Sequence, residues 1–438
     1  MFIDKYQGKP KILFIGLAES SHTVSWIDLL NNEGFNIRLF AVPTGGLPPS
    51  KWKVPVYLPL QQPVPGLDKA VRQTLYSNHI EFGKNRARFE PILWIWNICR
   101  KILNFGGMKL GFPRLVSVQE SVLGDLAEYW LAEIIQEWQP DIVHTLGVDH
   151  NQGGLFFLNT VKQKRITKNW IWIAHLRGGS DLTLNRHDPK KLSSIREVLE
   201  SCDQIISDNI INIKYVVQMG IPQTKFADIT PVPGTGGVNI DELSKRWKDL
   251  PSKRERIILW PKVYDCEWAL ALPVFEALQK CWEQIQPCEV YMLTMTTPGT
   301  RDWYNAMPEH IRAHCHVYGR LPRDKVFSIL LQARVLLSPS LVDGIPNVLY
   351  EAMASGTFPI VSPLETIMSI MEEEENVLFA RNLYPEEIAN ALVRAMNDDN
   401  LVDSTAKNNL EKVYRLADRK VIKQIVSSYY KKICGKIP

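Results

Sequence analysis

Two carboxylates near a predicted helix start form the pattern in this sequence that could most directly do chemistry. Asp343 and Glu351 lie eight positions apart, and Pro346 stands between them, where a polar loop is expected to lead into a helix. Unpaired peptide N–H groups at a helix start carry the positive end of the helix dipole, so an anion or a phosphate fits there. We expect both carboxylates to face one crevice and to accept hydrogen bonds from hydroxyl groups. The spacing alone leaves open a plain helix with an acidic first turn.

Two histidines end predicted strands in the first half of the chain. His175 closes the strand 170–175 and is followed by Arg177 and two glycines, while His144 closes the strand 141–144. A histidine at such a position can hydrogen-bond a hydroxyl group of a ligand or release a proton near neutral pH. The alternative is a polar residue that only satisfies its own surroundings.

The elements that must position these residues alternate between strand and helix, in two halves that meet at a charged stretch around Pro251. Nearly all-apolar short runs predict buried parallel strands: 11–16, 36–40, 141–144, 170–175, 204–207, 257–260, 290–293, 335–338 and 358–361. Helical periodicity predicts helices at 24–33, 120–138, 270–282, 323–333, 348–354 and 418–433. This alternation favours doubly wound parallel sheets, in which ligands bind beyond the carboxyl ends of the strands. Gly16 is not part of a G-x-G-x-x-G motif, which disfavours a nicotinamide cofactor.

Composition narrows the function classes. The 438 residues are 45% hydrophobic and 22% charged, and 51 basic against 47 acidic residues leave a net charge of +4. These values exclude a mainly disordered chain and give no bulk-charge argument for nucleic acid. The chain has no apolar run of 18 residues, so a membrane-spanning protein is not expected. Seven scattered cysteines without a CxxC pair indicate a reducing, cytoplasmic setting.

One segment, Phe82–Leu115, fits neither half of the chain. Its basic residues oppose a single acid, and apolar residues including Trp94 and Trp96 stand among them. Such a stretch can lie in a membrane interface with its cations on anionic headgroups. A helix that caps the first domain with a buried apolar face is the alternative.

The string Gly344–Gly356 resembles the E-x7-E signature of retaining glycosyltransferases of family 4. Asp343 stands where that family usually has Glu. The resemblance covers nearly the whole chain and is weakest from residue 54 to 118. It implies a GT-B fold, with two Rossmann-like doubly wound domains facing a central cleft. The domains would be an acceptor domain at 1–250 and a donor domain at 251–417, with a helix at 418–438 crossing back to the first domain.

The resemblance also implies roles for individual residues. Asp343 would contact the donor sugar's hydroxyl groups, Glu351 the ribose of the nucleotide, and His175 the donor sugar from the first domain. Lys262 stands in for the arginine of the family's Arg-x4-Lys pair, but no lysine follows at the expected place, so Arg177 or Arg320 would have to supply the second cation. The remaining implied contacts are to the sugar and diphosphate (Gly344, Ile345, Pro346, Asn347, Val348), to the nucleobase (Gly319, Arg320, Leu321), and in the acceptor-side loops (Ser21, His22, His144, Arg177). For His22, plain loop solvation is the alternative.

The implied reaction moves a sugar from a nucleotide-sugar to a hydroxyl of a glycan, a lipid or a small molecule, with the anomeric configuration retained. In the family the leaving phosphate is usually inferred to take the acceptor's proton, so no protein base, metal or cofactor is expected. His314 and His316 share one face of a predicted strand, but no further ligands lie at metal-binding spacing. Two rivals remain: a nucleotide-sugar-binding protein without turnover, and a GT-B enzyme acting on the nucleotide-sugar alone, such as an epimerase.

Overall fold

The computed structural model describes residues 2–43, 46–59, 79–82 and 127–435. Apart from Phe82, the basic, Trp-rich segment therefore lies outside the described residues. Contacts divide the chain into two compact units. The first holds residues 1–176, 189–206 and 427–438, and the second holds 177–188 and 207–426. This grouping by contacts does not test the domain boundaries predicted from the sequence, which stay predictions.

The first unit is built on a seven-stranded sheet with the order β4-β3-β2-β1-β5-β6-β7. The strands are β1 (Lys11–Gly16), β2 (Asn36–Ala41), β3 (Val56–Leu58), β4 (Ile80–Phe82), β5 (Ile142–Thr145), β6 (Ile171–Leu176) and β7 (Gln204–Ser207). Five neighbouring pairs, from β4–β3 to β5–β6, are parallel. Because the chain order reverses between β1 and β5, a crevice for a ligand is expected beyond their carboxyl ends.

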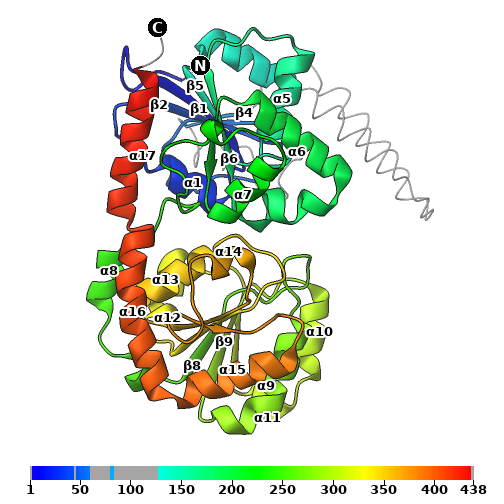
Figure 1. Cartoon of the computed structure of the whole chain (residues 1–438), viewed down its shortest axis with the longest axis vertical. Coiled ribbons are helices and arrows are strands. Elements are labelled where there is room, and N and C mark those ends of the chain that lie inside the picture. The colour runs from blue at the N-terminus through cyan, green and yellow to red at the C-terminus, as the bar shows by residue number, and fades with distance from the viewer. Residues whose placement is uncertain (1, 44–45, 60–78, 83–126, 436–438) are drawn as a thin grey trace, which may run out of the picture. The chain divides into compact units, whose positions relative to one another are not determined.

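Helices connect these strands (Figure 1). They are α1 (Ser21–Ile27), a helix at 127–138, α5 (Gly154–Gln163) and α6 (Pro189–Ser201). β1 is almost entirely buried, as its apolar sequence predicts for a strand covered on both faces. α1 begins directly after the loop that follows β1, which places Ser21 and His22 in its first turn, where both are exposed.

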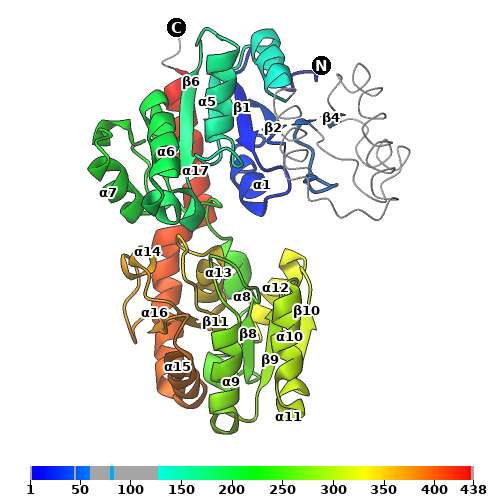
Figure 2. The ribbon, with the colours of Figure 1, turned by 90° about the vertical axis from the view of Figure 1, so that its right-hand side faces the viewer.

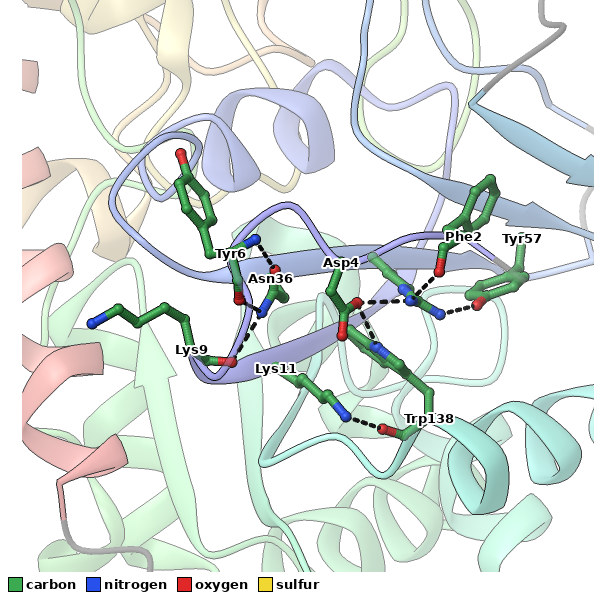
Figure 3. Close-up of polar contacts among 9 residues, drawn as sticks. Phe2, Asp4, Tyr6, Lys9, Lys11, Asn36, Tyr57 and Trp138 are labelled. Carbon is green, nitrogen blue, oxygen red and sulfur yellow. Dashed lines mark hydrogen bonds and ion pairs between the residues drawn. The ribbon is translucent and has the colours of Figure 1, made fainter.

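The N-terminal residues are fastened to β2 by buried polar side chains (Figure 3). Arg38 is 3% exposed and donates to Asp4 Oδ1 at 2.7 Å, to the carbonyl of Phe2 at 2.7 Å and to the Tyr57 hydroxyl at 2.6 Å. The Trp138 indole also donates to Asp4 Oδ1, at 2.9 Å. Hence a guanidinium that would be costly to bury alone gains an ion pair and hydrogen bonds.

The second unit carries a six-stranded sheet with the order β10-β9-β8-β11-β12-β13. Its strands are β8 (Ile257–Trp260), β9 (Glu289–Leu293), β10 (Cys315–Tyr318), β11 (Val335–Ser338), β12 (Phe358–Val361) and β13 (Leu378–Phe379), and every neighbouring pair is parallel. Here the chain order reverses between β8 and β11. Alternate residues of β8 enter two different cores, Ile258 and Trp260 on one face and Ile257 and Leu259 on the other.

Helices flank this sheet, as Figure 2 shows for α9 and α12 among others. The helices of the second unit are α7 (Ile210–Gln218), α8 (Ile240–Arg246), α9 (Leu272–Ile285), α10 (Pro298–Ala306), α11 (Glu309–Arg312), α12 (Arg323–Leu330), α13 (Asn347–Ser355), α14 (Glu365–Met368), α15 (Pro385–Asn397) and α16 (Asp399–Ala417). The last helix, α17 (Arg419–Cys434), belongs to the second unit up to Val426 and to the first from Ser427. The helix predicted at the C-terminus is thus present and joins both units.

The predicted doubly wound α/β class is confirmed, and several element bounds need correction. α1 ends at Ile27, although apolar periodicity predicted a helix that runs past Leu30 and is stopped by Gly34. α12 ends at Leu330, three residues before its predicted end. The charged stretch around Pro251 contains a short 3-10 turn, Pro251–Lys253. The sequence analysis did not predict several helices, namely α5 to α8, α10, α11 and α14 to α16. It also did not predict the short strands β3, β4 and β13, because runs of two or three residues carry too little periodicity.

Candidate active site

Lys262 and Asp343 meet at the point where the strand order of the second sheet reverses. Lys262 follows β8, and Asp343 lies in the loop that follows β11, the neighbouring strand. Their side chains form an ion pair and are 24% and 20% exposed. Burial by itself lowers the pKa of Lys262, but Asp343 and Tyr264 outweigh it and raise that pKa above its ordinary value. A fixed cation beside a carboxylate can receive an anionic and a hydroxyl-bearing part of one ligand.

The loop of Asp343 is held from two sides. The backbone N–H of Leu341 donates to the carbonyl of Trp268 at 2.7 Å. The buried Thr366 hydroxyl contacts the carbonyls of Asp343 and Gly344, each at 3.0 Å. No side chain caps the start of α13 behind this loop, where Pro346 takes the N-cap position. The uncapped N–H groups therefore offer the positive helix end that the sequence predicted for an anion.

Glycines let a second loop lie directly against this one. A Cβ atom on Gly344 would be 2.5 Å from the Cα of Gly178, and one on Gly179 would be 2.9 Å from the Cα of Asp343. Arg177 begins this second loop and is buried. The negative charges of Asp181 and Asp208 act on its guanidinium. Burial lowers the pKa of the Arg177 guanidinium, and the two acids oppose that effect.

Glu351 lies within α13 and pairs with a cation that the sequence did not single out. Arg323, at the start of α12, donates to Glu351 Oε1 at 2.9 Å. Burial raises the pKa of the Glu351 carboxyl, and Arg323 acts in the opposite direction. The two predicted carboxylates thus have different cationic partners, and their sharing of one crevice stays a prediction.

The glycine-rich turn at 233–239 is bound to the start of α13 and to the end of α16. The Thr235 hydroxyl donates to the side-chain carbonyl of Asn347 at 2.6 Å. The N–H of Val238 donates to the carbonyl of Ala417 at 2.8 Å, and Arg419 donates to the carbonyl of Thr235 at 2.9 Å. The C-terminal helices therefore fix a turn that contacts residues 343–348, which we call the predicted donor loop.

In the first unit His144 and His175 are fully buried in an aromatic cluster. The His175 ring lies 4.3 Å from the Trp26 ring and 5.4 Å from that of His144, between centroids. His144 Nδ1 is hydrogen-bonded to the hydroxyl of Tyr430, which belongs to α17. These contacts account for the burial of both rings, and the sugar-contacting roles implied for them stay predictions.

The remaining predicted contacts lie on the surface of the second unit or along its donor loop. Gly319 and Arg320 are exposed after β10, Leu321 is half-buried, and space around Gly319 is open. Ile345 and Val348 are half-buried beside the core of the sheet.

His314 and His316 both contact Glu289, at 2.8 and 2.7 Å, and together they lower the pKa of the Glu289 carboxyl against the effect of burial. Within the part of the chain that the structure describes, no group of three or more acidic, histidine or cysteine residues is arranged to hold a metal ion.

Comparisons with known proteins support this architecture. Residues 305–412, which include Asp343 and Glu351, match the family described as Glycosyl transferases group 1. No curated protein shows significant sequence similarity to the chain. Sucrose-phosphate synthase from Thermosynechococcus elongatus has a similar structure, with a TM-score of 0.66 at 15% identity over 98% of this chain and 100% of that one. HepE from Anabaena in complex with UDP-glucose gives 0.62 at 12% identity over 96% and 99%. A putative UDP-N-acetylglucosamine 2-epimerase from Listeria monocytogenes gives 0.57 at 13% identity over 97% and 98%.

The fold is of the GT-B type. At these identities the structural likeness establishes the fold alone, with its two Rossmann-like units. In this GT-B protein the family match covers the predicted donor loop and the E-x7-E-like pair, whereas Lys262, Arg177 and the two buried histidines lie outside the matched segment. Among the described residues, none of the helices is long and apolar enough to cross a lipid bilayer.

Sequence reasoning missed four residues that build the site: Asp208, Arg323, Thr366 and Arg419. Asp208 directly follows the predicted strand 204–207, so the strand-end rule that selected His144 and His175 could have found it. The other three gave no local signal, because their partners lie between 22 and 184 positions away.

Proposed function

We propose that this protein is a retaining glycosyltransferase of family 4 type that moves a sugar from a UDP-sugar to an acceptor hydroxyl. The observation that carries the proposal is the Lys262–Asp343 pair at the reversal point of the second sheet, directly before the uncapped start of α13. UDP is favoured as the nucleotide because HepE, a structural relative, was solved with UDP and with UDP-glucose. The acceptor is proposed to be a glycan, a lipid-linked molecule or a small molecule.

Each polar group near the donor loop then has a task. Lys262 and the N–H groups of Asn347 and Val348 stabilise the leaving diphosphate, and Glu351 accepts hydrogen bonds from the ribose. Asp343 binds hydroxyl groups of the donor sugar, and His175 contacts that sugar from the first domain. Preorganised charges of this kind lower the barrier because they need no rearrangement as the diphosphate departs. Arg177 or Arg320 supplies the second cation, in place of the missing lysine.

The nucleobase is proposed to lie against the backbone of Gly319, Arg320 and Leu321, where space is open. Ser21, His22 and His144 are assigned to the diphosphate and acceptor side. The reaction is proposed to need no metal or cofactor.

Peripheral membrane contact through residues 82–115 remains a proposal from the sequence. Failure of the protein to sediment with anionic vesicles at low salt would count against it.

The test measures UDP release and product formation from UDP-glucose and other UDP-sugars with panels of glycan, lipid and small-molecule acceptors. Acceptor-dependent transfer with a retained anomeric configuration in the product supports the proposal. Asp343→Ala should lower transfer at least about a hundredfold, the scale of losing one preorganised contact to the reacting centre. The same variant should leave UDP affinity within about a factor of two, since Asp343 is assigned to the sugar. Binding of UDP-sugars with no turnover in any acceptor mixture would favour the nucleotide-sugar-binding alternative.

An enzyme acting on the nucleotide-sugar alone is the second candidate. The Listeria monocytogenes structure described as a putative UDP-N-acetylglucosamine 2-epimerase favours it, because its fold matches nearly the full chain. This candidate predicts turnover of UDP-N-acetylglucosamine without any acceptor. Absence of that turnover, together with acceptor-dependent transfer, decides for the transferase.

A further inference from the structure

Asp208 is a buried acid at the carboxyl end of β7 that no predicted role has used. It is 7% exposed. Its Oδ2 atom accepts the backbone N–H of Gly178 at 2.7 Å, and its Oδ1 atom accepts the side-chain amides of Asn209 at 2.6 Å and Asn212 at 3.5 Å. One carboxylate thus accepts three hydrogen bonds, from two segments of the second unit.

Three glycines bring separate loops against this carboxylate. A Cβ atom on Gly344 would lie 3.2 Å from Asp208 Oδ2, and one on Gly234 would lie 3.4 Å from it. Gly178 donates to the same oxygen. Three segments therefore meet at Asp208 Oδ2: the loop after β6, the glycine-rich turn at 233–239 and the predicted donor loop.

The charges around Asp208 oppose each other. Burial raises the pKa of Asp208 to about 6, although Gly178, Asn209 and Arg177 act to lower it, and the nearby Asp343 raises it further. Arg177 is in turn balanced by Asp181, and Asp343 is paired with Lys262. The Tyr350 hydroxyl also faces this charge, and burial together with Asp208 raises its pKa. Asp208 therefore changes charge near pH 6, within a network of charged groups that reaches Asp343 in the predicted donor loop.

We infer that Asp208 is a positioning residue: its ionised carboxylate holds Arg177 and Gly178 against the donor loop and so organises the site for a diphosphate-linked sugar. The inference rests on the proposed donor site, but the contacts that carry it belong to the protein alone. Protonation of Asp208 weakens the charge-assisted bond to Gly178 and removes a counter-charge of Arg177, which loosens the loop.

The first test uses hydrogen exchange of the unliganded protein and needs no ligand. Protection of the peptide covering 177–184 is measured at pH 7.5 and at pH 5, corrected for intrinsic exchange rates. In the wild type, protection should fall about ten- to a hundredfold at pH 5, the scale of one charge-assisted hydrogen bond. Asp208→Asn should show the lower protection already at pH 7.5, whereas Asp302→Asn, an exposed control on α10, should behave as wild type. Unchanged wild-type protection between the two pH values overturns the inference, even if the variant does not fold.

The second test measures binding of UDP-glucose between pH 5 and pH 8. This probe is suitable because its diphosphate diester keeps the same charge throughout the range. Wild-type affinity should fall by up to about tenfold at pH 5, because a carboxyl with a pKa of about 6 is then about nine-tenths protonated. Asp208→Asn should bind weakly with little dependence on pH. Binding by the variant that equals the wild type at every pH overturns the inference and leaves the proposed function standing. Loss of loop protection as expected, with no UDP-glucose binding by any form, supports the positioning of the loop and contradicts the proposed donor.

Discussion

Glu351 shows how burial and a neighbouring cation set the state of one side chain in the candidate site. Its carboxyl group is nearly buried in α13, and burial raises its pKa, yet Arg323 donates to it at 2.9 Å from α12. The half-exposed guanidinium favours the ionised form, which is the form that accepts two hydroxyl groups of a ribose. The pair is therefore suited to ligand binding more than to stability.

The first prediction concerns this carboxylate. Glu351→Ala should weaken UDP binding by about 1–3 kcal/mol, the value of charged hydrogen bonds in a buried site. Isothermal titration calorimetry with UDP measures the effect. Glu411→Ala, an exposed change on α16, serves as the matched control and should bind UDP as the wild type does. Equal affinity in the Glu351 variant would remove the ribose role.

At the scale of elements, the glycine-rich turn depends on a backbone shape that only glycine tolerates there. Gly237 has a φ of +82°, and a Cβ atom on it would lie 2.4 Å from the carbonyl oxygen of Ala417. Gly34 has a similar φ of +86° but open space around its Cβ position. Comparing the two positions separates backbone strain from collision.

Gly237→Ala should lower the free energy of unfolding by at least about 2–3 kcal/mol, since strain and a clash with backbone add. Gly34→Ala should cost about 1 kcal/mol, from strain alone. Urea unfolding followed by circular dichroism gives both values. Equal losses at the two positions would show that the contact with the end of α16 does not constrain the turn.

The N-terminal segment makes a second element-scale prediction. Asp4→Ala removes the acceptor shared by the buried Arg38 and the Trp138 indole, so it should destabilise the protein by about 1–3 kcal/mol. Lys5→Ala next to it removes two contacts of an exposed ammonium, to Asn32 and over the Tyr6 ring, and should change stability by less than about 0.5 kcal/mol. If urea unfolding gives the same free energy of unfolding for both variants, the contacts of Asp4 with Arg38 and Trp138 do not contribute to stability.

At the scale of the whole molecule, Asp208 links stability to pH. Its folded-state pKa of about 6 exceeds the ordinary value of 3.8, so the folded protein binds this proton more tightly than the unfolded chain does. For global unfolding, the contribution of Asp208 is therefore most favourable below pH 4 and is lost as the pH rises through 6, because the cost of burying the charge outweighs the local contacts that the ionised carboxylate makes to Gly178 and Arg177. From the two pKa values the loss is about 3 kcal/mol.

The stability of Asp208→Asn relative to the wild type should accordingly rise by about 2 kcal/mol between pH 4.5 and pH 7.5, since part of the effect lies below pH 4.5. Glu374→Gln provides a control of opposite sign, because Arg394 lowers the pKa of Glu374 and its stabilisation is lost as the pH falls. Urea unfolding at both pH values measures the two differences. A difference for Asp208→Asn that does not change with pH contradicts the assignment.

The sequence by itself determined the α/β class, most strands, and the loop-to-helix position of Asp343 and Glu351. These features follow from local apolar periodicity and from chain neighbours, which act over a few residues. It also marked Gly344 in the predicted donor loop, although not the Gly178 backbone that Gly344 packs against.

Only the tertiary structure decided which charges meet. Lys262 and Asp343 are 81 positions apart, Glu351 and Arg323 are 28 apart, and Arg38 and Asp4 are 34 apart. The tertiary structure also decided that Asp208 accepts a hydrogen bond from the backbone N–H of Gly178, and that α17 is shared by both units. Such pairings depend on how parallel strands are ordered in a sheet, and strand order is a long-range property that local sequence patterns do not specify.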